Sequence, residues 1–182
     1  MILSRRKGRP SLETSSTKWC KDIFEEVMRR IDHTLDICDP FALNNTLGWP
    51  FTNDINPNSK ADYNMDAIDF LNLMVMEGHE FDLILFDPPF SFRQADRYVG
   101  SVTNVYTAPA YVKRCYESMY KIVKPGGYIL KFGFNSTRDH KGLTLVEMWC
   151  INHGGNHNDT LVTLWQRQNE DIMSFSTEEM LE

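Results

Sequence analysis

The segment that most constrains the fold of this chain is the run Phe81 to Phe86, which is almost entirely apolar and ends at Asp87-Pro88-Pro89. A strand with one solvated face alternates apolar and polar residues, whereas a near-continuous apolar run predicts a strand that is buried on both faces. Such strands lie in parallel sheets that helices cover on each side. We therefore expect an α/β protein whose sheet is built around this strand.

Other segments supply the remaining parts of such a sheet. Apolar residues recur at three- and four-residue spacing in expected helices at residues 18–31, 68–76 and 109–123. Further strands are expected at residues 34–38, 51–55, 128–134, 143–151 and 160–166. Lys124-Pro125-Gly126-Gly127 is expected to end the last helix. This order predicts a mostly parallel sheet with helices on both faces and a C-terminal β-hairpin.

The length and charge of the chain limit its organisation and its partners. A chain of 182 residues has room for one buried core, expected at residues 18–168, between a basic flexible arm at 1–17 and an acidic tail at 169–182. The net charge of −6 excludes a protein that coats nucleic acid over its whole surface. No apolar run approaches the roughly 20 residues that span a bilayer, and no signal-peptide core is present. We therefore expect a cytoplasmic protein without membrane contact.

Cysteine and histidine residues predict neither a disulfide framework nor a metal site. The four cysteines form no CxxC pair and are expected to be reduced core residues. Cys150, His153 and His157 are spaced like zinc ligands, but no fourth ligand is evident. The intervening Gly154-Gly155 explains the segment as a turn, so no resident metal is expected.

The tetrapeptide Asp87, Pro88, Pro89 and Phe90 carries the most specific chemical signal. Two consecutive prolines fix φ and remove backbone donors, so the loop is stiff before any substrate arrives. Asp87 and Pro88 add a carboxylate and a carbonyl as hydrogen-bond acceptors, and Phe90 adds an aromatic ring. The plainer interpretation is a rigid exit from a strand, with no catalytic role.

With a buried strand before it, and a helix and another strand after it, this loop resembles the DPPY-type loop of S-adenosylmethionine-dependent amino-methyltransferases, over about residues 34–166. The resemblance implies a Rossmann-like methyltransferase fold, S-adenosylmethionine as the cofactor, and Asp87 to Phe90 as the catalytic loop. In that loop, the Asp87 carboxylate and the Pro88 carbonyl would accept the hydrogens of an exocyclic amine and orient its lone pair. Phe90 would stack on a base that is rotated out of its helix. It implies that the cofactor is bound by Asp39, Pro40, Phe41, Ala42, Asp54, Asp66 and Ala67.

Within that resemblance, the segment Asp39 to Ala42 would hold the methionine part of the cofactor, Asp54 would accept hydrogen bonds from the ribose hydroxyls, and Asp66 and Ala67 would meet the adenine edge. Taken singly, such aspartates are more often helix caps or turn formers. The chain departs from the family where Leu43, Asn44 and Asn45 replace small residues. The short interval between Asp39 and Asp54 predicts that the usual intervening helix is shortened or lost.

The DPPF form of the loop favours adenine N6 in DNA as the methylated amine. Cytosine N4, guanine N2 in RNA, and an inactive methyltransferase-like protein that binds a partner or nucleic acid remain alternatives. A chain of this size leaves no separate target-recognition domain. Target recognition is therefore expected to be loose, or to come from the long loop at residues 91–108, from the basic arm, or from a protein partner.

Overall fold

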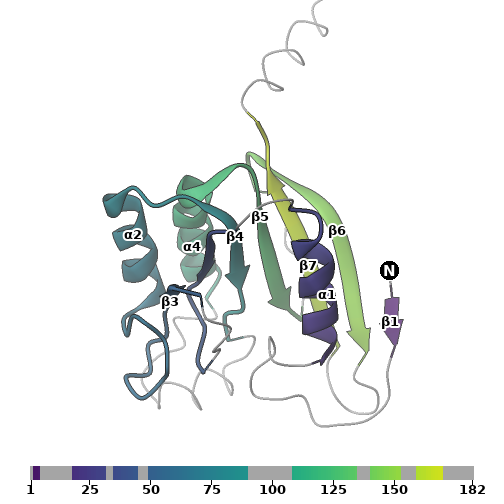
Figure 1. The fold of residues 1–182 in the computed structure, drawn as a ribbon, viewed down its shortest axis with the longest axis horizontal. Coiled ribbons are helices and arrows are strands. Elements are labelled where there is room, and N and C mark those ends of the chain that lie inside the picture. The colour runs from purple at the N-terminus through teal and green to yellow at the C-terminus, as the bar shows by residue number, and fades with distance from the viewer. Residues whose placement is uncertain are drawn as a thin grey trace, which may run out of the picture.

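The computed structural model describes residues 2–4, 18–31, 35–44, 49–89, 108–134, 140–152 and 159–169. Their strands are β1 (Ile2–Ser4), β2 (Ile37–Asp39), β3 (Phe51–Thr52), β4 (Phe81–Phe86), β5 (Val123–Gly133), β6 (Leu143–Asn152) and β7 (Thr160–Arg167). Their helices are α1 (Lys18–Met28), α2 (Ala67–Glu77) and α4 (Pro109–Ile122). None of these helices is long and apolar enough to cross a bilayer. All the strands belong to one sheet (Figure 1).

The sheet has the order β1-β6-β7-β5-β4-β2-β3. Strands β3, β2, β4 and β5 are mutually parallel, and β7 runs antiparallel to both β5 and β6. The chain leaves β2 toward β3 on one side and later returns as β4 on the other side. The order of the strands therefore reverses between β2 and β4, which is the place where open α/β sheets bind their ligands.

Helices cover both faces of this sheet, as the sequence predicted. Side chains of α2 and α4 pack on one face together with Ile84 and Phe86, and side chains of α1 pack on the other face with Leu83 and Leu85. Every residue of β4 is buried. The lack of alternation in this strand is thus explained by two apolar layers, and the predicted mostly parallel sheet with a C-terminal hairpin is confirmed.

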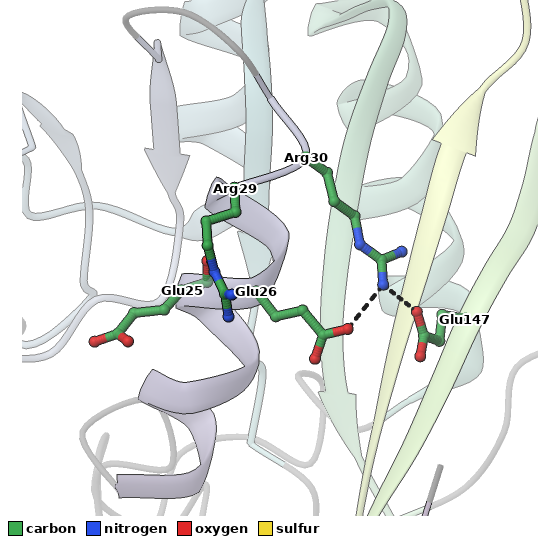
Figure 2. Close-up of polar contacts among 5 residues, drawn as sticks. All are labelled: Glu25, Glu26, Arg29, Arg30 and Glu147. Atoms are coloured by element: carbon green, nitrogen blue, oxygen red, sulfur yellow. Dashed lines mark hydrogen bonds and ion pairs between the residues drawn. The ribbon is translucent and has the colours of Figure 1, made fainter.

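Helix α1 is joined to β6 by charged and aromatic contacts at its C-terminal end. Figure 2 shows Arg30 between Glu26 of α1 and Glu147 of β6, and its guanidinium binds both carboxylates. The hydrogen bond to Glu147 raises the pKa of Arg30 above its usual value. The guanidinium carbon also lies 5.9 Å from the ring centroid of Trp149. Because these charged side chains are about one-third exposed, each ion pair should stabilise the fold by no more than about 1 kcal/mol.

Two local features differ from the sequence predictions. Residues Ile2–Ser4 of the expected arm form β1, which pairs with Cys150–Asn152 of β6. Helix α4 leads directly into β5, and Lys124-Pro125-Gly126-Gly127 is a bulge within that strand, because Phe81 pairs with Val123 but Leu83 pairs with Tyr128. Gly126 supplies the positive φ of +78° that the bulge requires.

The sequence predicted that the usual helix between β2 and β3 is shortened or lost, and the described residues of this interval contain none. Residues 40–44 and 49–50 form turns and contain no helix. β2 begins later than predicted and β3 is only two residues long. This agrees with the prediction that the usual helix is shortened or lost, although residues 45–48 lie outside the described residues.

The bulge brings Lys124 to the amino end of β4, where its ammonium contacts Asp82. This ion pair gives a prediction about the stability of the fold. The Lys124 ammonium lies 3.0 Å from Asp82, whose side chain is 8% exposed and also accepts the Asp36 backbone N–H at 2.9 Å. Asp82→Ala leaves that N–H without its acceptor, so we expect the free energy of unfolding to fall by about 2–3 kcal/mol. Asp36 binds the same ammonium, but its side chain is 58% exposed. In urea unfolding, Asp36→Ala should therefore lower the same quantity by less than about 1 kcal/mol, and equal losses would contradict this assignment.

Candidate functional site

The acids predicted to form a site follow the carboxyl ends of adjacent strands. Asp39 ends β2, Asp54 lies two residues beyond β3, and Asp87 directly follows β4. Asp39 is paired with Thr52, and Cys38 with Ile84, so the three strand ends lie at the same edge of the sheet. The structure therefore brings Asp39 and Asp54, which were predicted to bind the cofactor, and Asp87, which was predicted to be catalytic, to the two sides of the reversal point.

The loop after β2 folds back onto the end of β3. Asp39 is 2% exposed, and its carboxylate accepts the Phe41 N–H at 3.1 Å. The Ala42 N–H donates to the Asn53 carbonyl at 2.8 Å. Phe41 packs edge-to-face on Phe86 with ring centroids 5.6 Å apart. The predicted cofactor loop thus contacts the residue immediately before Asp87.

Leu43 adopts the backbone conformation that a glycine would supply in this loop. Its φ is +50°, the only positive value for a residue other than glycine in the described chain. The left-handed conformation costs a non-glycine residue about 1–2 kcal/mol, and the Leu43 N–H compensates by donating to the Asp54 carboxylate at 3.0 Å. The presence of leucine where the family has a small residue therefore does not prevent the turn, although the Leu43 side chain occupies space beside the loop.

Asp54 is the central acceptor of this loop. One carboxylate oxygen accepts the Leu43 N–H, and the other accepts the Asn56 N–H at 2.8 Å. Burial raises the pKa of Asp54 above its ordinary value, and the hydrogen bonds from Asn56 and Leu43 oppose that shift. Each carboxylate oxygen retains a second lone pair. Asp54 can therefore hold the loop and still accept a hydrogen bond from a hydroxyl group.

Asp66 and Ala67 begin α2, and the structure shows Asp66 as a helix cap. Its carboxylate accepts the Ile68 N–H at 2.8 Å and the Tyr111 hydroxyl at 3.1 Å. Tyr111 belongs to α4 and is 5% exposed, so the cap joins the two helices on this face. The first N–H groups of a helix have no acceptor within the helix. Ala67 is 4% exposed, and its contact with the adenine edge stays a prediction.

Asp87, Pro88 and Pro89 leave β4 beside β5, where Phe86 pairs with Lys131. Pro88 is buried, whereas Asp87 and Pro89 are half-buried. Phe90 and residues 91–107 lie outside the described residues, as do Arg5, Arg6, Lys7 and Arg9 of the expected arm. The stacking role of Phe90 therefore stays a prediction.

Cysteine chemistry finds no support in the described part of the chain. Burial raises the pKa of the Cys38, Cys115 and Cys150 thiols, to about 12 for Cys115, so few thiolates form at neutral pH. His153 and His157 lie outside the described residues. Among the described side chains no cluster of three potential metal ligands occurs.

Asn53 and Lys131 are features of this region that the sequence patterns did not single out. Asn53 is 0% exposed, directly between β3 and Asp54. Lys131 is 9% exposed, and two residues earlier Ile129 packs with α2 and α4, so both side chains face that layer. Burial lowers the pKa of Lys131 to about 8. The sequence signal that could have identified Lys131 is a lysine within an otherwise apolar strand segment.

The depressed pKa of Lys131 predicts how stability depends on pH. The unfolded chain binds this proton up to about pH 10.5, whereas the folded chain releases it near pH 8. Below pH 8 the folded state therefore holds a buried charge, and this penalty disappears as the pH rises from 8 toward 10.5. Lys131→Met is expected to raise the free energy of unfolding at pH 7 by up to about 3 kcal/mol. Denaturant titrations of both proteins should show this advantage fading above pH 8, and an advantage independent of pH would contradict it.

Comparisons with known proteins bear on the fold. No protein-family model matches the sequence, and no curated protein is detectably related to it. Among solved structures, the chain is similar to a candidate methyltransferase, yhhF, from Escherichia coli, with a TM-score of 0.58 and 11% identity over 85% of this chain and 88% of that one. A hypothetical protein of Thermus thermophilus has a TM-score of 0.56 and 15% identity over 88% and 91%.

The N-methyltransferase NodS from Bradyrhizobium japonicum is also similar, with a TM-score of 0.50 and 12% identity over 85% of this chain and 99% of that one. Together these structures show that the chain has the Rossmann-like fold found in methyltransferases. The predicted fold class is therefore confirmed.

Proposed function

We propose that this chain transfers a methyl group from S-adenosylmethionine to an exocyclic amine of a nucleic-acid base, with adenine N6 in DNA as the first candidate. The observation that supports it is the placement of Asp39, Asp54 and Asp87 at adjacent strand ends on both sides of the reversal point. This placement occurs in a fold that the chain shares with methyltransferases.

The residues at the ends of β2 and β3 fit the polar groups of the cofactor. Asp54 is partly exposed and offers lone pairs to the ribose hydroxyls. Asp66 and Ala67 stand at the start of α2, directly after Met65. Asn53 hydrogen-bonds both to Met65 and to Pro40 in the loop after β2. The turn at Leu43 brings backbone groups of residues 39–43 around the end of β2. When bound, S-adenosylmethionine supplies an electrophilic methyl group on a sulfonium.

The residues after β4 would act on the base. The Asp87 carboxylate and the Pro88 carbonyl would each accept a hydrogen of the amine, so that the nitrogen lone pair points toward the methyl group. As the nitrogen–carbon bond forms, the sulfur–methyl bond would break and S-adenosylhomocysteine would leave. The nitrogen would become more acidic, and the Asp87 carboxylate would take the released proton. Target recognition would come from residues 91–108, from the basic arm or from a protein partner. Cytosine N4 and guanine N2 in RNA present the same amine chemistry.

A second candidate is a methyltransferase-like protein that binds nucleic acid or a partner without catalysis. The observation that favours it is Leu43, whose side chain stands in the turn where a small residue would let the cofactor approach the backbone. The two candidates differ in cofactor binding, which only the first requires.

The transfer reaction can be tested with S-adenosylmethionine carrying a labelled methyl group. Equal amounts of unmethylated DNA and RNA are offered to the protein, and nucleosides are identified by mass spectrometry after digestion. The proposal expects label on N6-methyladenine from DNA. Label on N4-methylcytosine or N2-methylguanine would move the assignment to the corresponding alternative. Absence of label from both polymers, with a cofactor that binds, would contradict a nucleic-acid substrate.

Phe90 gives a prediction that separates base stacking from loop rigidity. Stacking on a base contributes about 1–3 kcal/mol, so Phe90→Ala should weaken productive nucleic-acid binding roughly 10- to 100-fold, while Phe90→Tyr and Phe90→Trp should be tolerated. The melting temperature measured on the same three variants distinguishes the core alternative, in which alanine would lower stability by about 3–5 kcal/mol. Unchanged activity of Phe90→Ala would remove the stacking role.

A further inference from the structure

Asn53 makes a fully matched set of hydrogen bonds inside the protein. Its side-chain nitrogen donates to the Pro40 carbonyl at 3.1 Å and to the Met65 carbonyl at 3.0 Å, and its side-chain oxygen accepts the Met65 N–H at 3.1 Å. Two carbonyls thus meet the amide nitrogen and one N–H meets the oxygen, so the partners fix the orientation of the amide. Asn53 is 0% exposed, so water does not replace these partners.

These bonds join two segments that are distant in sequence and adjacent in space. Pro40 belongs to the loop after β2, and Met65 immediately precedes Asp66, the cap of α2. The backbone of Asn53 adds bonds from its N–H to the Asp39 carbonyl and from the Ala42 N–H to its own carbonyl, each 2.8 Å long. Asn53 therefore sets the spacing between the Asp39–Leu43 loop and the N-terminus of α2.

We infer that Asn53 is a positioning residue that sets the affinity of the cofactor site by holding these two segments at a fixed distance. The inference rests on the proposed function, in which the two segments hold opposite ends of one ligand. A preorganised site binds more tightly because less ordering is needed on binding. Asn53 itself need not touch the ligand, since it acts through Pro40 and Met65.

The substitution Asn53→Asp tests the positioning role of Asn53 with little change in the size of the side chain. Asn53→Asp keeps the shape of the side chain and the acceptor for the Met65 N–H, but it turns the two donor positions into repulsive contacts with the Pro40 and Met65 carbonyls. A matched control is Asp62→Asn. The Asp62 carboxylate accepts the Thr52 hydroxyl, and the Asp62 N–H donates to the Thr52 hydroxyl oxygen at 3.0 Å. The control thus weakens a neighbouring link of the same segment without touching Pro40 or Met65.

The experiment measures the Kd of S-adenosylhomocysteine by calorimetry, the melting temperature, and the KM and kcat for S-adenosylmethionine. We expect Asn53→Asp to raise Kd and KM at least about 10-fold with kcat at saturation within about threefold of wild type. Asp62→Asn should leave Kd within about twofold of wild type. Lowering the pH from about 8 to about 6 should partly restore the affinity of Asn53→Asp, because a protonated carboxyl regains one donor.

Each outcome decides a different point. Wild-type protein that does not bind S-adenosylhomocysteine would contradict the proposed function and not the hydrogen-bond geometry. Wild-type binding with unchanged Kd in Asn53→Asp, or equal losses in Asn53→Asp and Asp62→Asn, would overturn the positioning role. If Asn53→Asp does not fold, Asn53→Ser is measured at low temperature, where one hydroxyl can serve only part of the three bonds, and an unchanged Kd would again overturn the inference.

Discussion

Asp87→Ala is expected to lower kcat for methyl transfer by roughly 1000-fold or more, while the Kd of S-adenosylhomocysteine and the melting temperature change little. The carboxylate is assigned to the target amine, so its removal takes away both the orientation of the lone pair and the acceptor for the proton. Asp87 is half-buried, and the backbone pairing of β4 with β5 reaches Phe86, so the hydrogen bonds of the strand do not depend on the Asp87 side chain. Single-turnover transfer with saturating cofactor measures the chemical step directly.

Asp87→Asn is the matched variant for this prediction. Its side-chain oxygen can still accept a hydrogen of the amine, but the amide cannot take up a proton. We expect binding of the base to be partly retained and transfer to remain strongly impaired. Full activity of either variant would show that the Asp-Pro-Pro segment is only a rigid exit from β4.

Asp54→Ala is expected to act on the cofactor and not on the chemistry. In the proposed function Asp54 accepts two charge-assisted hydrogen bonds from ribose hydroxyls, and their loss should weaken binding of S-adenosylhomocysteine by about 3 kcal/mol or more, which is roughly 100-fold or greater. At saturating cofactor, kcat should stay near the wild-type value. The Leu43 and Asn56 N–H groups also lose their acceptor, so a fall of about 1–3 kcal/mol in the free energy of unfolding should accompany the change.

Asp54→Asn separates these two contributions, because its remaining oxygen can accept only one of the two backbone N–H groups while the charge is lost. We expect its stability to lie between those of wild type and Asp54→Ala, with affinity reduced nearly as much as in alanine. Equal losses of cofactor affinity in the Asp54 and Asp87 variants would show that the roles of the two acids have been assigned wrongly.

The parts of the fold that the sequence predicts well are those with a strong local pattern. The run Phe81 to Phe86 predicted β4 with its bounds, because burial on both faces removes alternation. Helix α2 was predicted near its observed ends, since Asp66 caps its start and Gly78 takes the left-handed conformation after its end. Asp39, Asp54 and Asp87 were predicted as site residues from the family resemblance, and parallel pairing places the strands they follow with their carboxyl ends at one edge of the sheet.

The parts that the sequence does not predict depend on contacts between distant segments. The bulge at Lys124 to Gly127 has the composition of a helix stop, and only pairing with β4 shows that it lies inside a strand. The φ of Leu43 reflects the acceptor that Asp54 provides, since leucine has no intrinsic preference for that conformation. Asn53 resembles any other polar turn residue until Pro40 and Met65 are placed beside it.

Calorimetric titration of the full chain with S-adenosylhomocysteine tests the central claim most directly, because every enzymatic alternative requires this site. The account predicts saturable binding of one ligand per chain, with a Kd well below about 1 mM and an affinity that falls in Asp54→Ala but not in Asp87→Ala. Absence of heat at millimolar ligand, with the protein folded by circular dichroism, would contradict the proposed methyltransferase function and leave the binding-protein alternative.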